Sequence, residues 1–379
     1  MTEQRAARKP LRVALVYLGR KGGGAIYSLE IAKALARLCE VIPIVSAQAQ
    51  NLVDWQATGL RVLEVPTYTG LVSFALASLD IRRHLRLRQM IKKLAPDVLY
   101  YPMTHLWTPI INVLSGRIPK VITLHDPVPH LGEANALLNV LARITLRQAT
   151  RVIVLSRAFV PTLVRQGIET SRIDVIPHGE FSFYRRMNPQ RGPRHTSERP
   201  QTILFFGRIS PYKGIDVLLD AYRDIQARVP GVCLKIVGSG DLRLYRDQLR
   251  QLPGVTVVNR WVADDEVSCF FTEADLVVLP YVDASQSGVI PIAYSFGVPV
   301  VATRVGGLPE QVDDGVTGRL VRPRDSNELA AACVELLQDS VLRERMGRAA
   351  LEKAAAEWSW RNIAQRVFQV LEAAAGKPE

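Results

Sequence analysis

The sequence predicts an α/β protein with two doubly wound domains, each a parallel sheet covered by helices on both faces. Its 379 residues are enough for two domains with separate cores. Short buried runs alternate with helical patterns in two successive series, and a polar stretch rich in arginine and proline separates the series at 185–200. With 48% hydrophobic and 22% charged residues, the composition excludes a disordered chain.

In the first series, the strands are expected where runs of four to six residues are apolar or β-branched, at 12–17, 41–45, 98–101, 121–124 and 152–155. Helical patterns lie between them, at 25–39, 71–94, 134–148 and 161–166. A helix after each strand is typical of βαβ units. We therefore predict a Rossmann-like domain over residues 1–185.

In the second series, strands are expected at 203–206, 233–237, 255–258, 276–279 and 299–302. This pattern predicts a linker at 186–200 and a second Rossmann-like domain at 201–355. The last segment, 356–379, contains a helix with an apolar face at Ile363, Val367, Val370 and Leu371. We expect this face to pack back toward the N-terminal domain. Ligands of such sheets bind at the carboxyl ends of strands, which predicts a central cleft between the domains.

The net charge of +12 is unevenly distributed along the chain. The first 200 residues hold 28 of the 48 basic and 13 of the 36 acidic side chains, which leaves 20 and 23 for the remainder. Such an excess suggests an anionic partner for the first half. Aromatic residues make up only 7% and are not interleaved with the basic ones, so nucleic acid is not expected.

The four cysteines show neither disulfide nor zinc spacing, which fits a reducing cytoplasm. No apolar run approaches the ~20 residues of a membrane span. We expect a cytoplasmic protein, with peripheral contact on the inner face of the membrane as a further possibility.

One helix is strongly basic. Leu87, Met90, Ile91 and Leu94 lie on one arc of this helix, and all of the cations of 82–93 except Arg83 fall outside that arc. Arg82, Arg86 and Lys93 are therefore candidates for contact with anionic lipid, at about 1 kcal/mol per residue. A merely solvated face explains the pattern equally well, and His84 is expected on the surface.

Three segments could bind an anion. Gly22, Gly23 and Gly24 follow the first strand and open a helix, a phosphate-binding arrangement, although the spacing matches neither GxGxxG nor a Walker loop. A tight turn is the alternative. In 205–214, Gly207 and Arg208 end a strand and Lys213 follows, so both cations could cradle a diphosphate and stabilise a departing phosphate.

The third segment, 279–291, follows an apolar strand and precedes a helix that Pro291 begins. Its small and polar residues are candidate anion ligands: Ser285, Gln286, Ser287 and Gly288. An ordinary helix cap at Ser287 is the alternative.

Across nearly the whole chain, these motifs resemble the retaining glycosyltransferases of family four (glycosyl transferases group 1), which have the GT-B fold. The resemblance rests on the triple-glycine loop, on "TLHD" and "VIPHG", and on "GRISPYKGID", "PYVDASQSGV", "FGVPVVAT" and "VGGLPE". Single motifs are weak, but their number and order are specific.

The resemblance implies a nucleotide-diphosphate-sugar donor held mainly by the second domain and an acceptor held mainly by the first. It implies that Arg208 and Lys213 bind the donor phosphates, and that His125 contacts the donor sugar near the reacting carbon. These three are the implied catalytic residues. It assigns the remaining donor contacts to the triple-glycine loop, to Gly207, to the amides around Ser287, Gly288 and Val289, and to the base-binding loop at Trp261 and Val262.

Cations and amides can take the place of a metal in this chemistry, so neither metal nor cofactor is expected. His125, at a strand end, is alternatively a buried structural histidine. His130 is a candidate for the acceptor side of the cleft.

One departure from the family is conspicuous. The family carries two glutamates eight positions apart, and the corresponding residues here are Ala284 and Ile292. Asp283 is a possible stand-in carboxylate, although strand alternation would point it elsewhere. In a front-face retaining reaction the leaving phosphate can itself accept the acceptor's proton, so loss of the first glutamate need not abolish transfer.

The sequence therefore predicts a glycosyltransferase that moves a sugar to a glycan or lipid-linked acceptor with retention, in polysaccharide or glycolipid synthesis. A non-catalytic binding protein on the same fold is the main alternative, because the glutamates are missing. A dehydrogenase is disfavoured, since neither the triple-glycine loop nor the second cluster, at Gly238 and Gly240, has the dinucleotide spacing.

Overall fold

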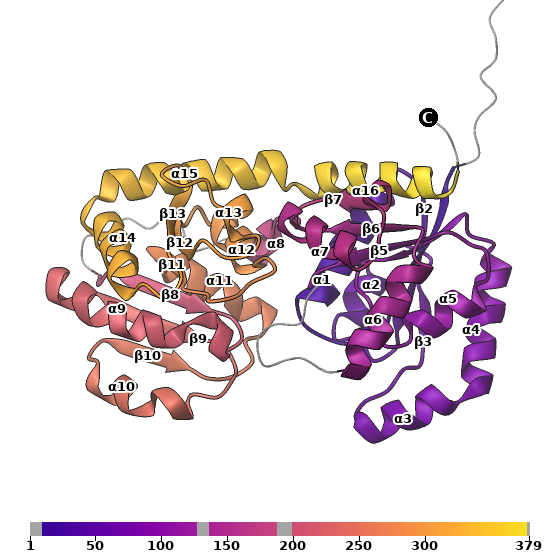
Figure 1. The fold of residues 1–379 in the computed structure, drawn as a ribbon, viewed down its shortest axis with the longest axis horizontal. Helices are drawn as coiled ribbons and strands as arrows, with labels where there is room; N and C mark the ends of the chain where they lie inside the picture. The colour runs from indigo at the N-terminus through magenta and orange to yellow at the C-terminus, as the bar shows by residue number, and fades with distance from the viewer. Residues whose placement is uncertain (1–9, 127–135, 188–198, 377–379) are drawn as a thin grey trace, which may run out of the picture.

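The computed structural model describes residues 10–126, 136–187 and 199–376. Figure 1 shows two lobes side by side, each built around a sheet, with the last two helices running along the top of both. We call the part around strands β1–β7 the first lobe and the part around β8–β13 the second lobe.

The first sheet has seven parallel strands in the order β3-β2-β1-β4-β5-β6-β7. The strands are β1 (Arg12–Tyr17), β2 (Glu40–Ser46), β3 (Leu63–Val65), β4 (Val98–Tyr101), β5 (Lys120–Leu124), β6 (Arg151–Val154) and β7 (Ile173–Val175). The helices that connect them are α1 (Gly23–Leu35), α2 (Leu52–Gln56), α3 (Leu71–Leu79), α4 (Ile81–Leu94), α5 (Thr108–Leu114), α6 (Ala136–Gln148), the 3₁₀ helix η1 (Arg157–Phe159), α7 (Val160–Arg165) and the 3₁₀ helix η2 (Thr170–Arg172).

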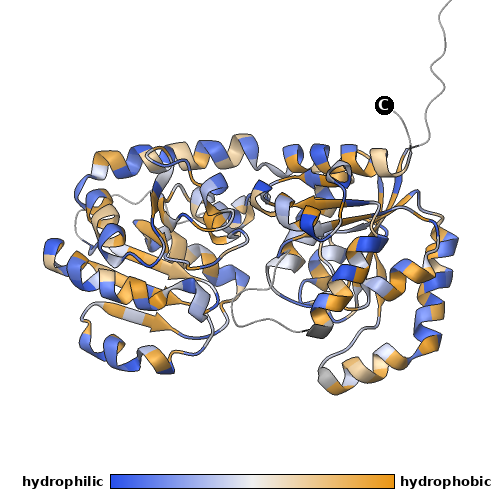
Figure 2. Ribbon diagram, viewed as in Figure 1, coloured by the Kyte–Doolittle hydropathy of each residue, from blue (hydrophilic) through white to orange (hydrophobic). Residues whose placement is uncertain are grey.

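Side chains of this sheet alternate between two buried layers. In β1, Val13 and Leu15 pack on the face covered by α1, whereas Ala14 and Val16 pack on the face covered by α4 to α7. Burial on both faces explains why the strands appear in the sequence as continuous apolar runs. Figure 2 shows hydrophobic residues concentrated in the strands and on the inner sides of most helices.

The second sheet has six parallel strands in the order β10-β9-β8-β11-β12-β13. These are β8 (Thr202–Phe206), β9 (Cys233–Val237), β10 (Val255–Val258), β11 (Leu276–Leu279), β12 (Val300–Thr303) and β13 (Gly318–Val321). The remaining helices are α8 (Ser182–Met187), η3 (Pro211–Lys213), α9 (Ile215–Arg228), η4 (Arg243–Tyr245), α10 (Arg246–Gln251), α11 (Asp264–Glu273), α12 (Val289–Ser295), α13 (Leu308–Gln311), α14 (Ser326–Gln338), α15 (Ser340–Glu357) and α16 (Trp360–Ala374).

The chain passes between the lobes at two adjacent points. Phe181 and Tyr184 already belong to the core of the second lobe, so the first passage lies near Glu180. This is ahead of the predicted linker, of which 188–198 lie outside the described residues. The return passage lies near Trp358, whose carbonyl accepts from the Glu180 N–H at 2.8 Å, while the Trp360 indole N–H donates to the Glu180 carbonyl at 2.8 Å.

After the return passage, helix α16 packs on the first lobe, alongside α1 (Figure 1). Its apolar face, which includes Ile363, Val367 and Leu371, is fully buried in the same cluster as Val13 and Leu15 of β1. The C-terminal helix is therefore part of the first lobe's core.

The predicted helix over 71–94 is in fact two helices. The chain breaks at Asp80, whose side chain caps α4 by accepting from the Arg83 N–H at 3.2 Å. The expectation for His84 was wrong: it is buried, because its ring packs edge-on against Trp107 and its Nε2 lies 3.0 Å from the Ser78 carbonyl oxygen.

Candidate active site

The strand orders place the predicted loops at the points where each sheet changes direction. In the first sheet β1 lies between β2 and β4, and in the second β8 lies between β9 and β11. Ligands of open parallel sheets bind outside the carboxyl ends of the strands at such points. The triple-glycine loop follows β1, and the segment with Arg208 and Lys213 follows β8.

A cavity of about 310 Å³ lies between these loops, with walls from both lobes. Seven of the predicted donor-binding residues line it: Gly22, Gly23, Gly207, Arg208, Trp261, Val262 and Gly288. The other predicted donor or catalytic residues are outside its lining: Gly24, His125, Lys213, Ser285, Gln286, Ser287 and Val289. The stand-in candidate Asp283 is also outside it, and His130 lies outside the described residues.

The triple-glycine loop turns sharply into α1. Gly22 has φ +89°, a value that side chains disfavour, and α1 begins at Gly23. A Cβ on Gly24 would lie 2.6 Å from the Met103 side chain, so this position has little room. Across the cleft, a Cβ on Gly22 would lie 3.8 Å from the Trp261 ring, and the Lys21 ammonium lies 5.9 Å from the centre of that ring. The loop thus closes over the predicted base-binding segment.

Lys213 is positioned by an aromatic ring. It ends the short helix η3, and Gly214 follows with φ +66° at a point where a Cβ would lie 2.0 Å from the Pro280 carbonyl oxygen. The Lys213 Nζ lies 3.6 Å from the centre of the buried Tyr281 ring. The Tyr281 hydroxyl is 3.3 Å from Ser287 Oγ. One buried ring therefore connects the lysine to the loop that precedes α12.

Two of the three amides expected to bind phosphate are engaged within the protein. The Ser287 N–H donates to Gln311 Oε1 at 2.8 Å, and the Val289 N–H donates to Ser287 Oγ at 3.2 Å. The Gln311 side-chain amide in turn donates to the Ser287 carbonyl at 3.0 Å. Gly288, between them, lines the cavity. The loop is thus held rigid by Gln311, with Gly288 presented to the cleft.

The cavity wall is apolar where the family has its second glutamate. Ile292 lines the cavity, while Ala284 is buried beneath the loop. The carboxylate that does line this cavity is Asp264, at the start of α11, which sequence reasoning missed. Its Oδ1 accepts from the Tyr184 hydroxyl at 3.0 Å, and burial raises its pKa. No local sequence motif indicates Asp264, because its hydrogen-bond partner Tyr184 is 80 positions away in the sequence.

His125 lies behind the triple-glycine loop in an aromatic cluster. Its Nε2 is 3.0 Å from the Pro102 carbonyl oxygen, and its ring packs edge-on against Tyr27 at 4.7 Å between centroids. His178 is the next ring, 5.9 Å from His125 and stacked on Phe181. Burial lowers the pKa of His125, so the ring is neutral and can donate to one acceptor only.

Two histidines outside the cavity lining, His105 and His178, predict a loss of stability in acid. Burial lowers the pKa of His178 to about 3 and that of His105 to about 4. The unfolded chain takes up these protons near pH 6.5, so the free energy of unfolding should fall as the pH drops from about 6.5 toward these values. Each histidine contributes a slope of up to about 1.4 kcal/mol per pH unit. Urea unfolding between pH 7 and 5 measures this slope. His178→Phe removes one titrating group and should lower the slope by up to about 1.4 kcal/mol per pH unit. An unchanged slope would contradict the assignment.

A carboxylate of the second lobe caps a helix of the first. Glu310, in α13, accepts from the Ser156 hydroxyl at 2.8 Å and from the N–H groups of Arg157 and Ala158 at 2.8 and 2.9 Å. The same segment supports the donor loop, because the Gly307 N–H donates to the Ser285 carbonyl at 3.0 Å. The relative position of the lobes and the shape of the donor loop are thus connected.

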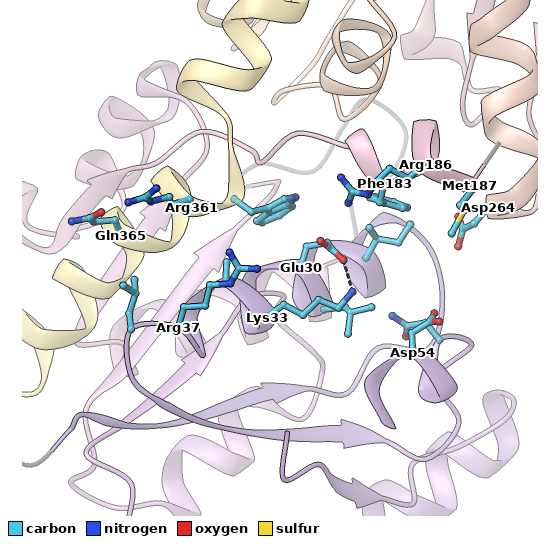
Figure 3. Close-up of a pocket in the computed structure, with 16 residues that line it drawn as sticks. Glu30, Lys33, Arg37, Asp54, Phe183, Arg186, Met187, Asp264, Arg361 and Gln365 are labelled. Carbon is cyan, nitrogen blue, oxygen red and sulfur yellow. Dashed lines mark hydrogen bonds and ion pairs between the residues drawn. The ribbon is translucent and has the colours of Figure 1, made fainter. Parts of the chain in front are cut away.

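A larger cavity of about 860 Å³ lies along α1, between α2, α8 and α16. Figure 3 shows charged side chains of both signs around it, including the Glu30–Lys33 ion pair at 2.8 Å. Ile26, Asn51 and Asp264 line both cavities, which therefore adjoin. None of the predicted phosphate-binding residues lines the larger one, so the smaller cavity is the candidate donor site.

In 10–126, 136–187 and 199–376, no three histidine, cysteine, aspartate or glutamate side chains gather as metal ligands. In the same ranges, no helix has the length and apolar character of a membrane span.

Comparison with known proteins places the whole chain among sugar transferases. The D-inositol 3-phosphate glycosyltransferase of Corynebacterium aurimucosum is 28% identical, over 93% of this chain and 91% of its own length. A GDP-mannose-dependent alpha-(1-6)-phosphatidylinositol monomannoside mannosyltransferase of Mycobacterium tuberculosis is 32% identical, over 54% of each chain.

Solved structures share the fold. Anabaena HepE in complex with UDP superposes with a TM-score of 0.74 at 22% identity, covering 96% of this chain and all of its own. Sucrose-phosphate synthase of Thermosynechococcus elongatus gives 0.72 at 20% identity, with 98% and 100% coverage.

Family models account for both lobes. The model "Glycosyltransferase Family 4" matches residues 21–179, and "Glycosyl transferases group 1" matches 200–339. The two matches cover the triple-glycine loop and the loop with Arg208 and Lys213, respectively. The chain therefore belongs to the family-four glycosyltransferases of the GT-B fold.

Proposed function

We propose that this enzyme transfers a hexose-like sugar from a nucleotide-diphosphate-sugar to a glycan or lipid-linked acceptor, with retention of the anomeric configuration. One observation carries the proposal: glycine-rich loops at the switch points of both sheets meet across one cavity, which Arg208 lines. A diphosphate can accept hydrogen bonds from the backbone amides of these glycines and pair with the Arg208 guanidinium. The reaction then belongs to polysaccharide or glycolipid synthesis.

In this proposal the donor lies between the lobes. Arg208, Lys213 and the Gly288 amide bind its phosphates, and the base lies near Trp261 and Val262. HepE was solved with UDP, and the mycobacterial mannosyltransferase is named for GDP-mannose, so both nucleotides are probes for this site. No metal is required, because the cations supply the charge that a metal would. Transfer rates should therefore be unchanged by EDTA.

The proposed chemistry needs no protein base. The acceptor hydroxyl oxygen bonds to the anomeric carbon on the face from which the phosphate departs, while the bond from that carbon to the phosphate oxygen breaks. The hydroxyl proton passes to the leaving phosphate oxygen, and the nucleoside diphosphate carries away the electron pair. Ala284 and Ile292 are compatible with this path. The single N–H of a neutral His125 is taken by the Pro102 carbonyl, so the ring can only accept a hydrogen bond, at Nδ1, from a sugar hydroxyl.

Activity with a panel of UDP- and GDP-sugars tests the proposal. Purified enzyme is incubated with each donor and with glycan or lipid-linked acceptors, and nucleotide release is measured together with the product's anomeric configuration by NMR. We expect release with one nucleotide class and an α-linked product from an α-linked donor. An inverted product would contradict retention.

The absence of both family glutamates favours a second candidate, a binding protein on the same fold. For that protein, calorimetry would show donor binding while no donor in the panel released nucleotide. This combined outcome would replace the catalytic proposal.

A further inference from the structure

The outer edge of the first lobe carries an apolar ridge on the surface. Figure 2 shows α3 as a mostly hydrophobic helix at the rim of the molecule, beside the more hydrophilic α4. Three residues of α3 and the first residue of α4 are 67–78% exposed: Val72, Leu76, Leu79 and Ile81. We call these four the apolar ridge. Large apolar residues that are exposed as a cluster mark an interaction surface, whereas single exposed apolar residues are normal on any protein.

The ridge does not result from a loosely attached helix. On its inner side, α3 is anchored by Phe74, whose ring stacks parallel to Trp107 at 6.3 Å between centroids. The Ser78 hydroxyl accepts from the Trp107 indole N–H at 2.8 Å, and Ala77 is buried. Because the inner face is fixed, the ridge must point outward.

Next to the ridge, α4 presents cations. Its buried face consists of His84, Leu87, Ile91 and Leu94. Arg82, Arg86 and Lys93 are exposed, as are Arg88 and Lys92. In the described part of α4 there is no acidic residue to balance them, and the capping Asp80 pairs with Arg83 at 3.6 Å. The sequence prediction located these cations but not the ridge beside them.

We propose that the apolar ridge and the α4 cations form one docking surface for an anionic lipid bilayer. The ridge enters the boundary between headgroups and acyl chains, and the cations pair with lipid phosphates. An apolar strip flanked by unbalanced positive charge is complementary to such a bilayer. A protein partner would instead need an apolar patch and an acidic patch side by side, to contact the apolar ridge and the α4 cations at once. This inference does not depend on the transfer reaction.

The surface is connected to the candidate active site. The segment before α3 contacts the loop after β1, because the Arg20 guanidinium lies 4.7 Å from the Tyr68 ring centre and donates to the Thr69 carbonyl at 2.6 Å. A bilayer held at α3 is thus one short segment away from the triple-glycine loop. If the proposed function holds, a lipid-linked acceptor can reach the cleft from this side without leaving the membrane.

Vesicle co-sedimentation of the full chain tests the surface. The probes are vesicles of phosphatidylcholine alone and with 30% phosphatidylglycerol, at about 0.1 M salt. We expect binding only to the anionic vesicles. Neutralising Arg82, Arg86 and Lys93 together to Gln should lower the partition coefficient about a hundredfold, from three cations. The ridge variant Val72→Ser, Leu76→Gln, Leu79→Gln, which keeps the charge, should lower it at least tenfold.

Matched controls come from the second lobe. Leu244 and Val341 are 82% and 75% exposed, and Arg345 and Arg348 are exposed cations. Their replacement by Gln should leave the partition coefficient unchanged, and circular dichroism checks folding of every variant. No binding of the wild type would overturn the proposal. So would equal losses in the controls, or self-association in sedimentation velocity that the ridge variant abolishes without any vesicle binding. Donor turnover, measured separately, keeps this outcome distinct from that of the proposed function.

Discussion

Replacement of Lys213 by alanine is expected to lower kcat by about two to three orders of magnitude, the usual effect of removing one preorganised donor to a developing negative charge. The lysine lies at the carboxyl end of the β8 segment, where its Nζ is held 3.6 Å from the Tyr281 ring centre. In the proposed reaction, charge grows on the leaving phosphate. A fixed cation there stabilises the transition state more than the bound donor, so kcat should fall more than donor affinity.

The measurement is steady-state nucleotide release with the donor identified in the panel, together with donor affinity from calorimetry. Lys235→Ala is the matched control, because Lys235 is also in the second lobe but lies within strand β9 and pairs with Glu273 at 2.6 Å. Its kcat should stay within about twofold. A kcat for Lys213→Ala as high as that of the control would remove Lys213 from the chemistry.

The largest expected effect on stability comes from Trp360→Ala. This side chain is 9% exposed, lies edge-on against Tyr27 at 5.3 Å between centroids, and donates to the Glu180 carbonyl. A Cβ on Gly179 would lie 2.6 Å from the indole, which shows how closely the backbone approaches the ring. Loss of a buried tryptophan lowers the free energy of unfolding by about 3–5 kcal/mol.

Denaturant unfolding, followed by circular dichroism, measures this effect. Trp360→Phe separates the two contributions, because it keeps most of the ring contact with Tyr27 but loses the hydrogen bond to Glu180. Its loss should be at most about half that of the alanine variant. A loss below 1 kcal/mol for Trp360→Ala would show that the two passages between the lobes do not depend on this side chain.

The strands could be predicted where a run of apolar residues in the sequence is also buried on both faces of a sheet. Strands β1 and β8 are buried on both faces, so they appear as apolar runs, and the glycine loops that follow them could be located. Strands β3 and β7, of three residues each, are too short to show a period. The break at Asp80 was also missed, because one capping side chain ends a pattern that is otherwise continuous.

The candidate site was predictable only in part, because the spacing of residues in the sequence does not show which backbone amides already donate hydrogen bonds within the protein. The sequence indicated the amides of Ser287 and Val289 but not Gln311, which takes up the first of them. It likewise could not place Asp264 on the cavity wall, since this position depends on how the two lobes meet. Exposure is a tertiary property too, so the helical pattern over 71–94 did not reveal the apolar ridge.

The position of α16 has a consequence for synthesis of the chain on the ribosome. The first lobe is translated before the second, but a buried part of its core is supplied by Trp360–Ala374, a helix that follows the second lobe in the chain. Until then, the apolar surface beside α1 that α16 covers remains uncovered, and the second lobe can fold before the first is complete. The order of translation is therefore the reverse of the order in which the lobes can finish folding.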